Sequence, residues 1–443
     1  MSKVRPAAGV IPVRGRQVYL VQRGHQGRFF PGFHAFPGGV QESQDADTLH
    51  CAVRELWEET GLWVGPQQPP PGLRQEWLNG HVPWSEIVDQ YPLELEKLAP
   101  AGIRTTPEYA LVRFRAHFFL WDCPARQLAE VWPGELEEGR WWDVDEALAA
   151  WRQARIFLAP PTRDSLTGLA QAGSLPEAVR LLSAYPEDTP DPIRMLPGLP
   201  YVPLETPTLP PARHTLCFLL GQRSLLLVDP GAADMARVEA VAPQVDAVIL
   251  THHHPDHVGG VARCRELGWP IWAHPRTGEQ LGLRLDRELQ DQDLVADWRV
   301  LHTPGHASGH LALWHEEHRV LLCGDLASGV STILVPVPDG NMSDYLVSLQ
   351  RCRDLKPRLV LPSHGGPFGP GSDLIGQTLK HRLERESRVR GALGGSFAQI
   401  LAEAYADVSG PPLEYAKISL LAHLEKLERD GRAQRAGERW LPA

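Results

Sequence analysis

The sequence predicts a multidomain protein that combines α/β and α+β architectures. Its 443 residues are too many for one ordinary hydrophobic core, so we expect two or three domains. Short apolar strands alternate with helices through most of the chain, and helices followed by a short hairpin make up its end. These patterns place domains at residues 1–185, 212–375 and 376–443, with a connector at residues 186–211.

The segment 1–185 is predicted to be a mixed α/β domain. Val10 to Gln22 has the pattern of a strand-turn-strand pair, and Leu49 to Thr60 has that of a helix. Tyr109 to Trp121 is rich in Phe and Val and predicts a long strand. Between them, Pro66 to Gly72 predicts an irregular, proline-rich loop.

The connector at residues 186–211 carries prolines at short intervals and shows no amphipathic period. This composition predicts a semi-rigid, extended segment that includes the entry strand of the next domain.

The segment 212–375 is rich in predicted strands, and loops that contain His and Asp follow several of them. The expected strands are Thr215–Leu220, Ser224–Val228, Asp246–Leu250, Arg299–His302, Leu311–Trp314, Val320–Cys323 and Leu359–Leu361. Helical stretches separate some of these strands, so we expect layered α/β structure.

The last segment, 376–443, is predicted to be mainly helical. Leu379–Leu393, Phe397–Ala406 and Ile418–Asp430 have helical patterns, and Gly431 ends the last of them. Ala433–Leu441 predicts a small hairpin or wing.

Composition narrows the class of protein. The formal net charge of −10 argues against a protein that coats nucleic acid. The six cysteines are scattered without a C-x-x-C pair, which favours reduced thiols over a disulfide framework. The N-terminal Met1 to Pro6 lacks the apolar core of a signal peptide, and no apolar run approaches the roughly 18 residues of a membrane span. We therefore expect a cytoplasmic protein with no membrane partner.

A first group of metal-ligand candidates follows the buried strand Asp246–Leu250, in the sequence from Thr251 to His257. Because side chains two residues apart in extended backbone point the same way, His252 and His254 can bind one ion. Asp256 and His257 lie at the turn into the next helix and can face a second ion. Imidazoles with one or two carboxylates suit zinc, or manganese or iron.

Three more candidates lie where a predicted strand ends in a glycine-containing loop: His306, Asp325 and His364. The first group has the motif H-x-H-x-D-H, and His306, Asp325 and His364 follow it along the chain in that order. This order resembles the metallo-β-lactamase superfamily across residues 215–366. The resemblance implies an αββα sandwich. It also implies a first metal held by His252, His254 and His306, a second held by Asp256, His257 and His364, and Asp325 as a bridge between them.

Other residues near this motif have less definite roles. Asp229 matches the superfamily's early structural Asp, and His253 is expected to point away from the metals. Asp256 is expected to be catalytic as well as a ligand. For His310 two roles stay open: it contacts substrate or donates a proton to the leaving group, or it supports a ligand from behind.

The C-terminal segment resembles the winged helix that ends β-lactamase-like endoribonucleases specific for single strands. The same group includes glyoxalase-II-like thioester hydrolases. A winged helix can bind nucleic acid through phosphate contacts. Here the expected recognition helix carries Glu425, Glu428 and Asp430, so a packing or dimer role is an equal alternative.

A second metal site is predicted in the first segment. Phe36 to Gly39 and then Arg54-Glu55-Leu56-Trp57-Glu58-Glu59-Thr60-Gly61-Leu62 resemble the Nudix box, which implies an α/β/α Nudix domain. On a helix, Glu55 lies one turn before Glu58 and Glu59, so their carboxylates can share one edge. Oxygen ligands of this kind suit Mg²⁺ or Mn²⁺ with a diphosphate. The resemblance makes Glu55, Glu58 and Glu59 metal ligands, with Glu58 and Glu59 also catalytic.

The box departs from the family at one point. Asp45 stands where the first Glu belongs, with eight residues rather than seven before Arg54. This looser spacing resembles the coenzyme A diphosphatase branch. Arg54 is expected to orient a glutamate by ion pairing, and Gly61 to allow the left-handed turn that ends the helix.

The two motifs predict a bifunctional metal-dependent hydrolase. The second half would use zinc-activated hydroxide on an ester, thioester or phosphodiester, and the first half Mg²⁺ or Mn²⁺ on a nucleoside-diphosphate-linked compound such as a coenzyme A derivative. The alternative is an endoribonuclease acting on single-stranded RNA, with an accessory or regulatory Nudix module. Expected partners are a nucleotide or thioester substrate or RNA, and the sequence leaves oligomerisation open.

Overall fold

The computed structural model describes residues 4–25, 27, 30–132, 134–221, 224–410 and 412–443, so Met1 to Lys3 of the N-terminal stretch lie outside the described residues. The chain forms two compact units. The first contains Met1–Pro200 and Gly369–Ser372, and the second contains Tyr201–Phe368 and Asp373–Ala443.

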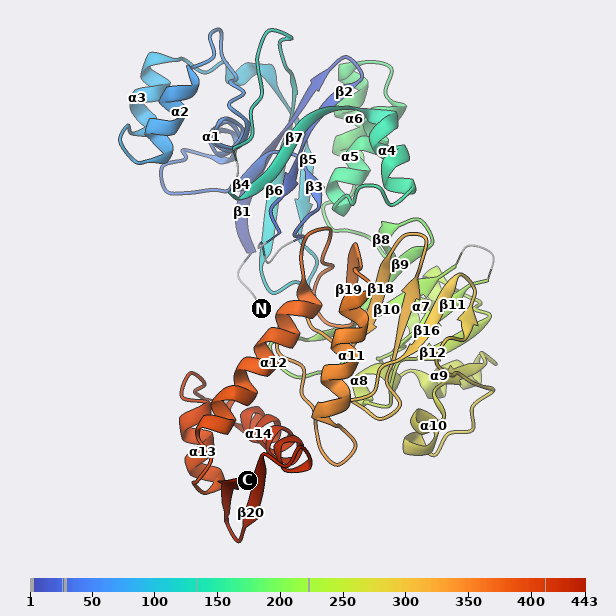
Figure 1. Cartoon of the computed structure of the whole chain (residues 1–443). Coiled ribbons are helices and arrows are strands. Elements are labelled where there is room, and N and C mark those ends of the chain that lie inside the picture. The colour runs from blue at the N-terminus through green and yellow to red at the C-terminus, as the bar shows by residue number, and fades with distance from the viewer. Residues whose placement is uncertain (1–3, 26, 28–29, 133, 222–223, 411) are drawn as a thin grey trace. The chain divides into compact units, whose positions relative to one another are not determined.

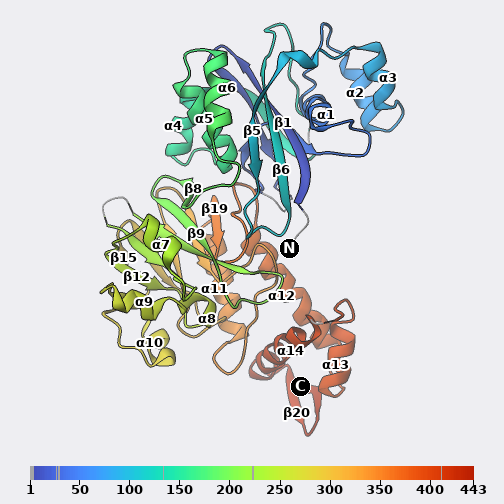
Figure 2. The same cartoon turned by 180° about the vertical axis from the view of Figure 1, so that it is seen from behind.

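The first unit is built on one mixed sheet of strand order β3-β2-β1-β6-β5, in which β4 also pairs with β1 and β7 with β2. The parallel pair β1–β6 is its centre. The strands are β1 (Val4–Arg14), β2 (Gln17–Arg23), β3 (His34–Ala35), β4 (Gly38–Val40), β5 (Leu98–Thr105), β6 (Arg113–Asp122) and β7 (Leu136–Asp143). Figures 1 and 2 show α1–α3 on one side of this sheet and α4–α6 on the other. The helices are α1 (Thr48–Thr60), α2 (Pro71–Leu78), α3 (Trp84–Gln90), α4 (Val144–Arg152), α5 (Pro160–Gln171) and α6 (Leu175–Ala184).

Helix α1 is defined by its caps. The Asp47 side chain accepts hydrogen bonds from the N–H groups of Leu49 and His50, and Gly61 ends the helix in the left-handed conformation at φ 70°. The apolar face of α1 packs on β1 and β6. The predicted helix and its glycine stop are therefore confirmed, and the polar edge of α1 is left free to form a site.

Three predictions for the first half were wrong in detail. The long strand begins at Arg113 rather than Tyr109. Helix α2 begins at Pro71, inside the stretch predicted to be a loop, because proline is accepted at the first position of a helix. The connector contains β8 (Ile193–Leu196) and β9 (Leu199–Glu205), so it is more regular than its prolines indicated.

The second unit contains two sheets with helices on their outer faces (Figures 1 and 2). One has the order β14-β13-β12-β11-β10-β9 and the other β15-β16-β17-β18-β19. The strands after β9 are β10 (His214–Leu220), β11 (Leu226–Val228), β12 (Ala247–Leu250), β13 (Ile271–Ala273), β14 (Arg287–Glu288), β15 (Leu294–Val295), β16 (Trp298–His302), β17 (Leu311–His315), β18 (Val320–Gly324) and β19 (Leu359–Pro362). The helices are α7 (Ala236–Val241), α8 (Pro255–Val258), α9 (Val261–Glu266), α10 (Pro275–Leu281) and α11 (Met342–Asp354). All seven strands predicted here are confirmed within a few residues.

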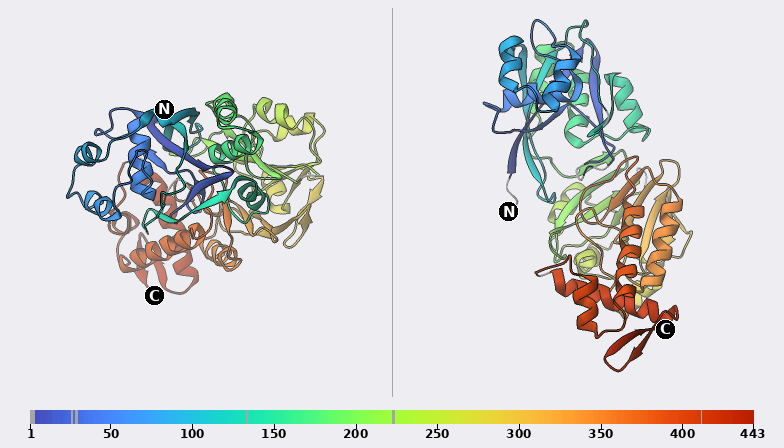
Figure 3. Two further views of the ribbon diagram at one scale, coloured as in Figure 1. Left: turned by 90° about the horizontal axis from the view of Figure 1, so that it is seen from above. Right: turned by 60° about the vertical axis from the view of Figure 1, so that its left-hand side comes forward.

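The C-terminal module continues the second unit, and Figure 3 shows its helices and hairpin in red. It consists of α12 (Leu374–Gly391), α13 (Phe397–Ala404), α14 (Pro412–Arg429), β20 (Ala433–Ala436) and β21 (Arg439–Pro442). Helix α12 packs against α11 as well as α13 and α14. The predicted hairpin is confirmed, whereas α12 and α14 begin earlier than Leu379 and Ile418.

Two predictions from composition can be compared with the structure. All six cysteines are free and buried, in agreement with the absence of a disulfide framework. Among the described residues, no helix combines the length and the apolar character that a membrane crossing requires.

Candidate metal centres

Loops at the ends of several strands in the second unit bring seven side chains together. The structure forms three groups of side chains whose ligand atoms all lie within 4.8 Å of one another. The groups are His252, His254 and His306; His252, His257 and Asp325; and Asp256, His257 and His364. The first and third groups are the two ligand sets expected from the sequence, and the middle group joins them.

The first set is compact. His252 Nε2 lies 3.1 Å from His254 Nδ1 and 3.2 Å from His306 Nε2. Neutral imidazole nitrogens this close together share a position that one cation can occupy. Burial, followed by the neighbouring histidines, lowers the pKa of His252 far below its usual value and that of His254 to about 3. Both rings are therefore neutral at physiological pH, as metal ligands must be.

Asp325 lies between the two sets. Its Oδ1 is 3.6 Å from His257 Nε2 and 3.4 Å from His364 Nε2, while its Oδ2 is 3.6 Å from His306 Nε2. One carboxylate oxygen thus faces each set. This is the geometry of a group that can bridge two ions.

The third set carries the negative charge of the site. Asp256 Oδ2 lies 3.4 Å from His364 Nε2. Although burial opposes it, the Asp325 and Asp256 carboxylates raise the pKa of His364 to about 10. Burial raises the pKa of Asp256, but the nearby His364 imidazole and the charge of His257 outweigh it and bring that pKa to about 2. The carboxylates therefore favour positive charge at this point, which a proton or a metal cation can supply.

The outward nitrogen of most of these rings is held by a fixed partner. His257 Nδ1 donates to Asp229 Oδ2 at 2.8 Å, His306 Nδ1 to the Leu334 carbonyl at 2.7 Å, and His364 Nδ1 to the His214 carbonyl at 3.0 Å. Such bonds fix the tautomer, so that Nε2 presents its lone pair to the centre.

Asp229 also organises the loop after β12. Its Oδ1 accepts from the Thr251 N–H at 2.8 Å, and its Oδ2 accepts from Thr251 Oγ1 at 2.7 Å. Because this hydroxyl donates to Asp229, its oxygen can accept from His252 Nδ1, 3.0 Å away. One buried carboxylate therefore positions two ring ligands, which is the structural role expected for it.

A test of whether a cation fits comes from the inward-facing atoms. His257 Nε2, His364 Nε2 and Asp325 Oδ1 are buried and have no hydrogen-bond partner among the described residues. Buried polar atoms without partners are costly, and several of them directed at one point are typical of a metal site. Imidazole and carboxylate donors suit zinc, iron or manganese, so the residues fit divalent metals.

His310 lies behind the site rather than in it. The ring is fully buried; its Nε2 accepts from the Asp325 N–H at 3.0 Å and its Nδ1 donates to Thr303 Oγ1 at 2.8 Å. With both nitrogens engaged, His310 has no atom left for a substrate. Of its two expected roles, the geometry favours support of Asp325. His253 points away from the ligands, with Nδ1 4.0 Å from Asp339 Oδ2.

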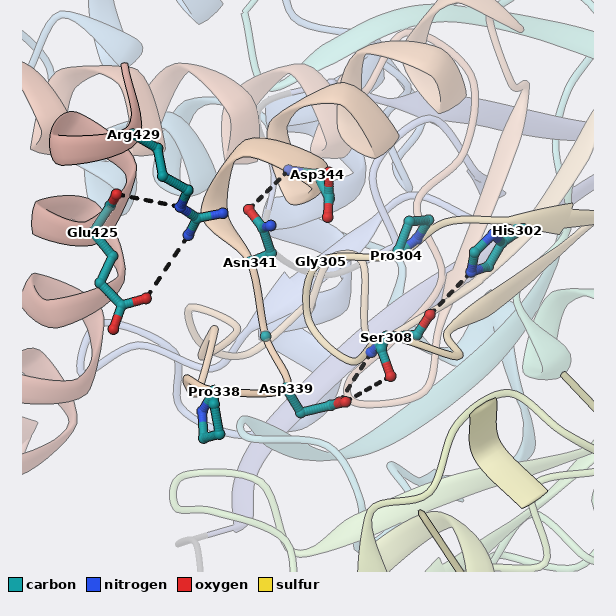
Figure 4. A pocket seen from close by; sticks show the side chains of 11 residues that line it. His302, Pro304, Gly305, Ser308, Pro338, Asp339, Asn341, Asp344, Glu425 and Arg429 are labelled. Atoms are coloured by element: carbon teal, nitrogen blue, oxygen red, sulfur yellow. Dashed lines mark hydrogen bonds and ion pairs between the residues drawn. The ribbon is translucent and has the colours of Figure 1, made fainter. Parts of the chain in front are cut away.

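A cavity of about 440 Å³ lies beside the loop that carries His306 (Figure 4). Asp339 holds this loop, accepting from the Ser308 N–H at 2.9 Å and from Ser308 Oγ at 2.6 Å. On the other side His302 Nε2 donates to the Ser308 carbonyl at 3.0 Å. Glu425 and Arg429 of α14 also line the cavity, so the C-terminal module reaches the outer side of the metal loop.

The predicted Nudix box of the first unit is organised by Arg54. Its guanidinium makes a two-point ion pair with Asp45, Nε to Oδ1 at 2.8 Å and Nη2 to Oδ2 at 2.9 Å. Other contacts reach Glu55 at 2.9 Å and Glu58 at 3.0 Å. Arg54 therefore orients two glutamates, and Asp45 orients Arg54 instead of joining the acidic edge.

The acidic edge of α1 is enclosed by the glycines before it. A Cβ at Gly39 would lie 2.5 Å from the Glu55 carboxylate, and the Gly38 N–H donates to Glu59 Oε2 at 2.9 Å. Burial, opposed by Arg54 and reinforced by Glu58, raises the pKa of Glu55 to about 7. Burial and then Glu55 raise the pKa of Glu59 well above its usual value. A cation would relieve this excess of buried carboxylate, so the residues fit Mg²⁺ or Mn²⁺.

The convergence of these glutamates is looser than the helix spacing predicts. Among the described residues of the first unit, no three carboxylate or imidazole groups place their ligand atoms within 4.8 Å of one another. Glu135, which lies outside the Nudix box, adds to the raised pKa of Glu55, Glu58 and Glu59. The spacing of the box could not identify this acid.

Near this site, buried His34 gives a prediction about pH. The ring packs edge-on against Trp142, with the centroids 5.9 Å apart, and burial followed by the charge of Arg140 lowers its pKa to about 4. Glu138 lies 3.7 Å from Nε2, but its carboxylate is largely exposed and screened, so burial dominates. The native state therefore excludes a proton that the unfolded chain binds below about pH 6.5.

The contribution of His34 to the unfolding free energy of the first unit is complete above pH 6.5 and is lost as the pH falls toward 4. Between pH 7 and pH 5 we expect this loss to be about 2 kcal/mol. Urea titrations at the two pH values measure this loss, and His34→Gln should remove it. An equal loss in the variant would assign the effect to other groups.

Comparison with known families matches three separate stretches of the chain. A model of the metallo-beta-lactamase superfamily matches residues 210–364, a NUDIX domain model matches residues 3–159, and a beta-lactamase associated winged helix domain model matches residues 396–440. Each covers one of the regions described above.

Curated relatives resemble part of the chain. A beta-lactamase-like protein 2 homolog of Caenorhabditis elegans is 26% identical over 193 residues, 40% of this chain and 64% of that protein. A hydroxyacylglutathione hydrolase of Bdellovibrio bacteriovorus is 33% identical over 141 residues, 30% of this chain and 55% of that protein. The chain thus spans less than two thirds of the length of these two relatives.

Two solved structures are each similar to part of this chain. A metallo-beta-lactamase family protein from Thermus thermophilus has a TM-score of 0.48 at 25% identity, covering 56% of this chain and 100% of that one. A NUDIX hydrolase from Alicyclobacillus acidocaldarius has a TM-score of 0.39 at 24% identity, covering 42% of this chain and 100% of that one.

Proposed function

We propose a specific chemistry for each half of this chain, which is a hydrolase that joins a NUDIX domain, a metallo-beta-lactamase domain and a beta-lactamase associated winged helix domain. The metallo-β-lactamase half hydrolyses a thioester, and the Nudix half cleaves a diphosphate bond in a nucleoside-diphosphate-linked compound. The two sites work independently, because each has its own set of metal-binding side chains.

The observation that carries the first proposal is the arrangement of two ligand sets about Asp325. In the proposal His252, His254 and His306 would hold one divalent cation and Asp256, His257 and His364 another, with the Asp325 carboxylate available to both sets. When bound, such cations act as Lewis acids that polarise a carbonyl and make water nucleophilic at neutral pH.

The protein's own groups prepare this chemistry. Asp256 has a pKa of about 2 and so stays ionised at neutral pH, which lets it bind a cation and orient the attacking water through its free lone pairs. Asp229 and the Leu334 carbonyl hold ring ligands in place, so that little reorganisation is needed during reaction. His310 fixes the backbone of Asp325.

In the Nudix half, Glu55, Glu58 and Glu59 would hold Mg²⁺ or Mn²⁺ with the diphosphate, and Glu58 and Glu59 would also take part in catalysis. A cation there supplies charge neutralisation for the phosphoryl oxygens. Arg54 keeps Glu58 turned toward the acidic edge, and the Gly38 N–H fixes Glu59.

Two features favour a small thioester for the metallo-β-lactamase half. The net charge of −10 disfavours a polyanion, and relatives named hydroxyacylglutathione hydrolase match this half. A second candidate is single-stranded RNA. It is supported by exposed arginines on the wing, Arg432, Arg435 and Arg439, which could contact phosphates.

An assay with two substrate classes tests the first proposal. The purified full-length chain is given acyl-coenzyme A or hydroxyacylglutathione thioesters, or 5′-labelled single-stranded RNA. We expect thioester turnover that Asp256→Ala lowers by about 10²-fold or more, because the change removes a proposed ligand itself, and losing even a partner of a ligand costs roughly 10- to 100-fold in such sites. Glu58→Gln should leave this turnover unchanged and abolish Mg²⁺-dependent diphosphate cleavage.

The outcomes separate the candidates. RNA cleavage that is lost in Asp256→Ala, with no thioester turnover in the wild type, would replace the thioester proposal by the nuclease one. Loss of both activities in Glu58→Gln would contradict independent sites.

A further inference from the structure

Arg382 is a buried cation in helix α12 of the C-terminal module, outside both proposed sites. Its side chain is 1% exposed. Among the described residues no carboxylate lies within ion-pair distance of it, whereas its neighbour on the helix, Arg385, pairs with Asp407 at 2.8 Å. A buried charge without a counter-ion is expensive, so the hydrogen bonds that Arg382 makes must matter to the structure.

Those bonds connect three segments. One nitrogen, Nη1, donates to Ser419 Oγ of α14 at 3.2 Å, and the other, Nη2, donates to the carbonyl of Ile333. The guanidinium carbon lies 5.7 Å from the centre of the Tyr345 ring of α11. Figure 1 shows α12 running from beside α11 to the C-terminal helices, which is the path these contacts require.

The loop that Arg382 holds also holds a proposed metal ligand. Ile333 and Val335 are buried, and the carbonyl of Leu334 between them accepts from His306 Nδ1 at 2.7 Å. His306 Nε2 lies at the first ligand set, 3.2 Å from His252 Nε2. One residue of backbone therefore separates the carbonyl bound by Arg382 from the carbonyl that orients His306.

We infer that Arg382 is a positioning residue for the first metal, and that the C-terminal module thereby forms part of the metal centre. The inference rests on the proposed metal ligands. Partners of the outer ring nitrogen set the orientation and basicity of a histidine ligand. A guanidinium presents its donors in a rigid, spaced fork that holds the loop carbonyl and α14 at once, whereas an ammonium offers its donors from a single atom.

The effect is specific to one ligand set. His257 is held by Asp229, and His364 by the His214 carbonyl, so neither depends on the loop at Ile333. Loss of Arg382 should therefore weaken the metal at His252, His254 and His306 and leave the metal at Asp256, His257 and His364 in place.

Metal titration of the full-length chain tests the inference. Chelator-stripped protein is titrated with Zn²⁺ by calorimetry, and Co²⁺ absorption reports ligand geometry. The wild type should bind two equivalents. In Arg382→Met we expect the affinity of one equivalent to fall about tenfold and its Co²⁺ bands to shift, because changes around metal ligands cost roughly 10- to 100-fold. Arg382→Lys should fall between the two.

Arg385→Met is the matched control, since Arg385 is also buried in α12 but bonds to the Ala404 carbonyl and Asp407. It should destabilise the module and leave both Zn²⁺ affinities unchanged. Equal losses in Arg385→Met and Arg382→Met would overturn the inference. If Arg382→Met does not fold, wild-type affinity in Arg382→Lys would overturn it. A wild-type chain that binds no divalent metal would instead refute the proposed function.

Discussion

Replacing Asp325 by alanine is expected to lower hydrolysis by the metallo-β-lactamase half by about three orders of magnitude or more. The Asp325 carboxylate is the group that faces both ligand sets, with His306 on one side and His257 and His364 on the other. Its loss removes the shared negative charge of a buried site. Stabilisation by a metal centre is worth several kcal/mol, and each 1.4 kcal/mol is about tenfold in rate.

The measurement is kcat/KM for the proposed thioester substrate, together with bound metal determined by inductively coupled plasma analysis. Asp354→Ala makes the same chemical change on the exposed end of α11 and should leave both quantities unchanged. Activity of Asp325→Ala within tenfold of the wild type, with both metals retained, would rule out a bridging role.

Replacing Asp45 by alanine is expected to lower the unfolding free energy of the first unit by about 3–5 kcal/mol. The side chains of Asp45 and Arg54 are 0% and 2% exposed and form a two-point ion pair. Removal of one partner leaves a buried guanidinium without its main counter-charge, which is where the cost arises. Diphosphate cleavage should fall as well, because Arg54 also orients Glu58.

Urea unfolding of the full-length chain at pH 7, followed by tryptophan fluorescence, measures this loss. Asp145→Ala serves as the control, because Asp145 pairs with Arg16 in the same unit while both side chains are more than half exposed. An exposed pair contributes at most about 1 kcal/mol. A loss for Asp45→Ala no larger than that of the control would show that the buried pair does not support the fold.

Asp45 also shows how far the residue spacing of the Nudix box predicts the role of a side chain. The sequence placed it at the position of a family glutamate, as a departure from the pattern. The structure uses it to hold Arg54, and Arg54 holds Glu55 and Glu58. Although eight residues rather than seven separate Asp45 from Arg54, its carboxylate reaches the guanidinium at two points.

The sequence by itself determined the strands and helices that carry the sites and the side chains that meet in the second unit. Proposed ligands such as His306 and His364 follow recognisable strands, and a strand's end is set by local pattern. Helix α1 could be predicted because its caps, Asp47 and Gly61, act within one turn of the chain.

Only the tertiary structure decided which groups hold those ligands. The carbonyls of Leu334 and His214 orient two rings, yet every residue has a carbonyl, so no letter in the sequence marks them. The role of His310 was also decided by the tertiary structure. Histidine is a reactive residue type, but this ring is buried and its Nε2 accepts from the Asp325 N–H. Arg382 acquires its role through the loop folded against it, because long-range packing, not local pattern, brings a helix of the C-terminal module to the metal loop.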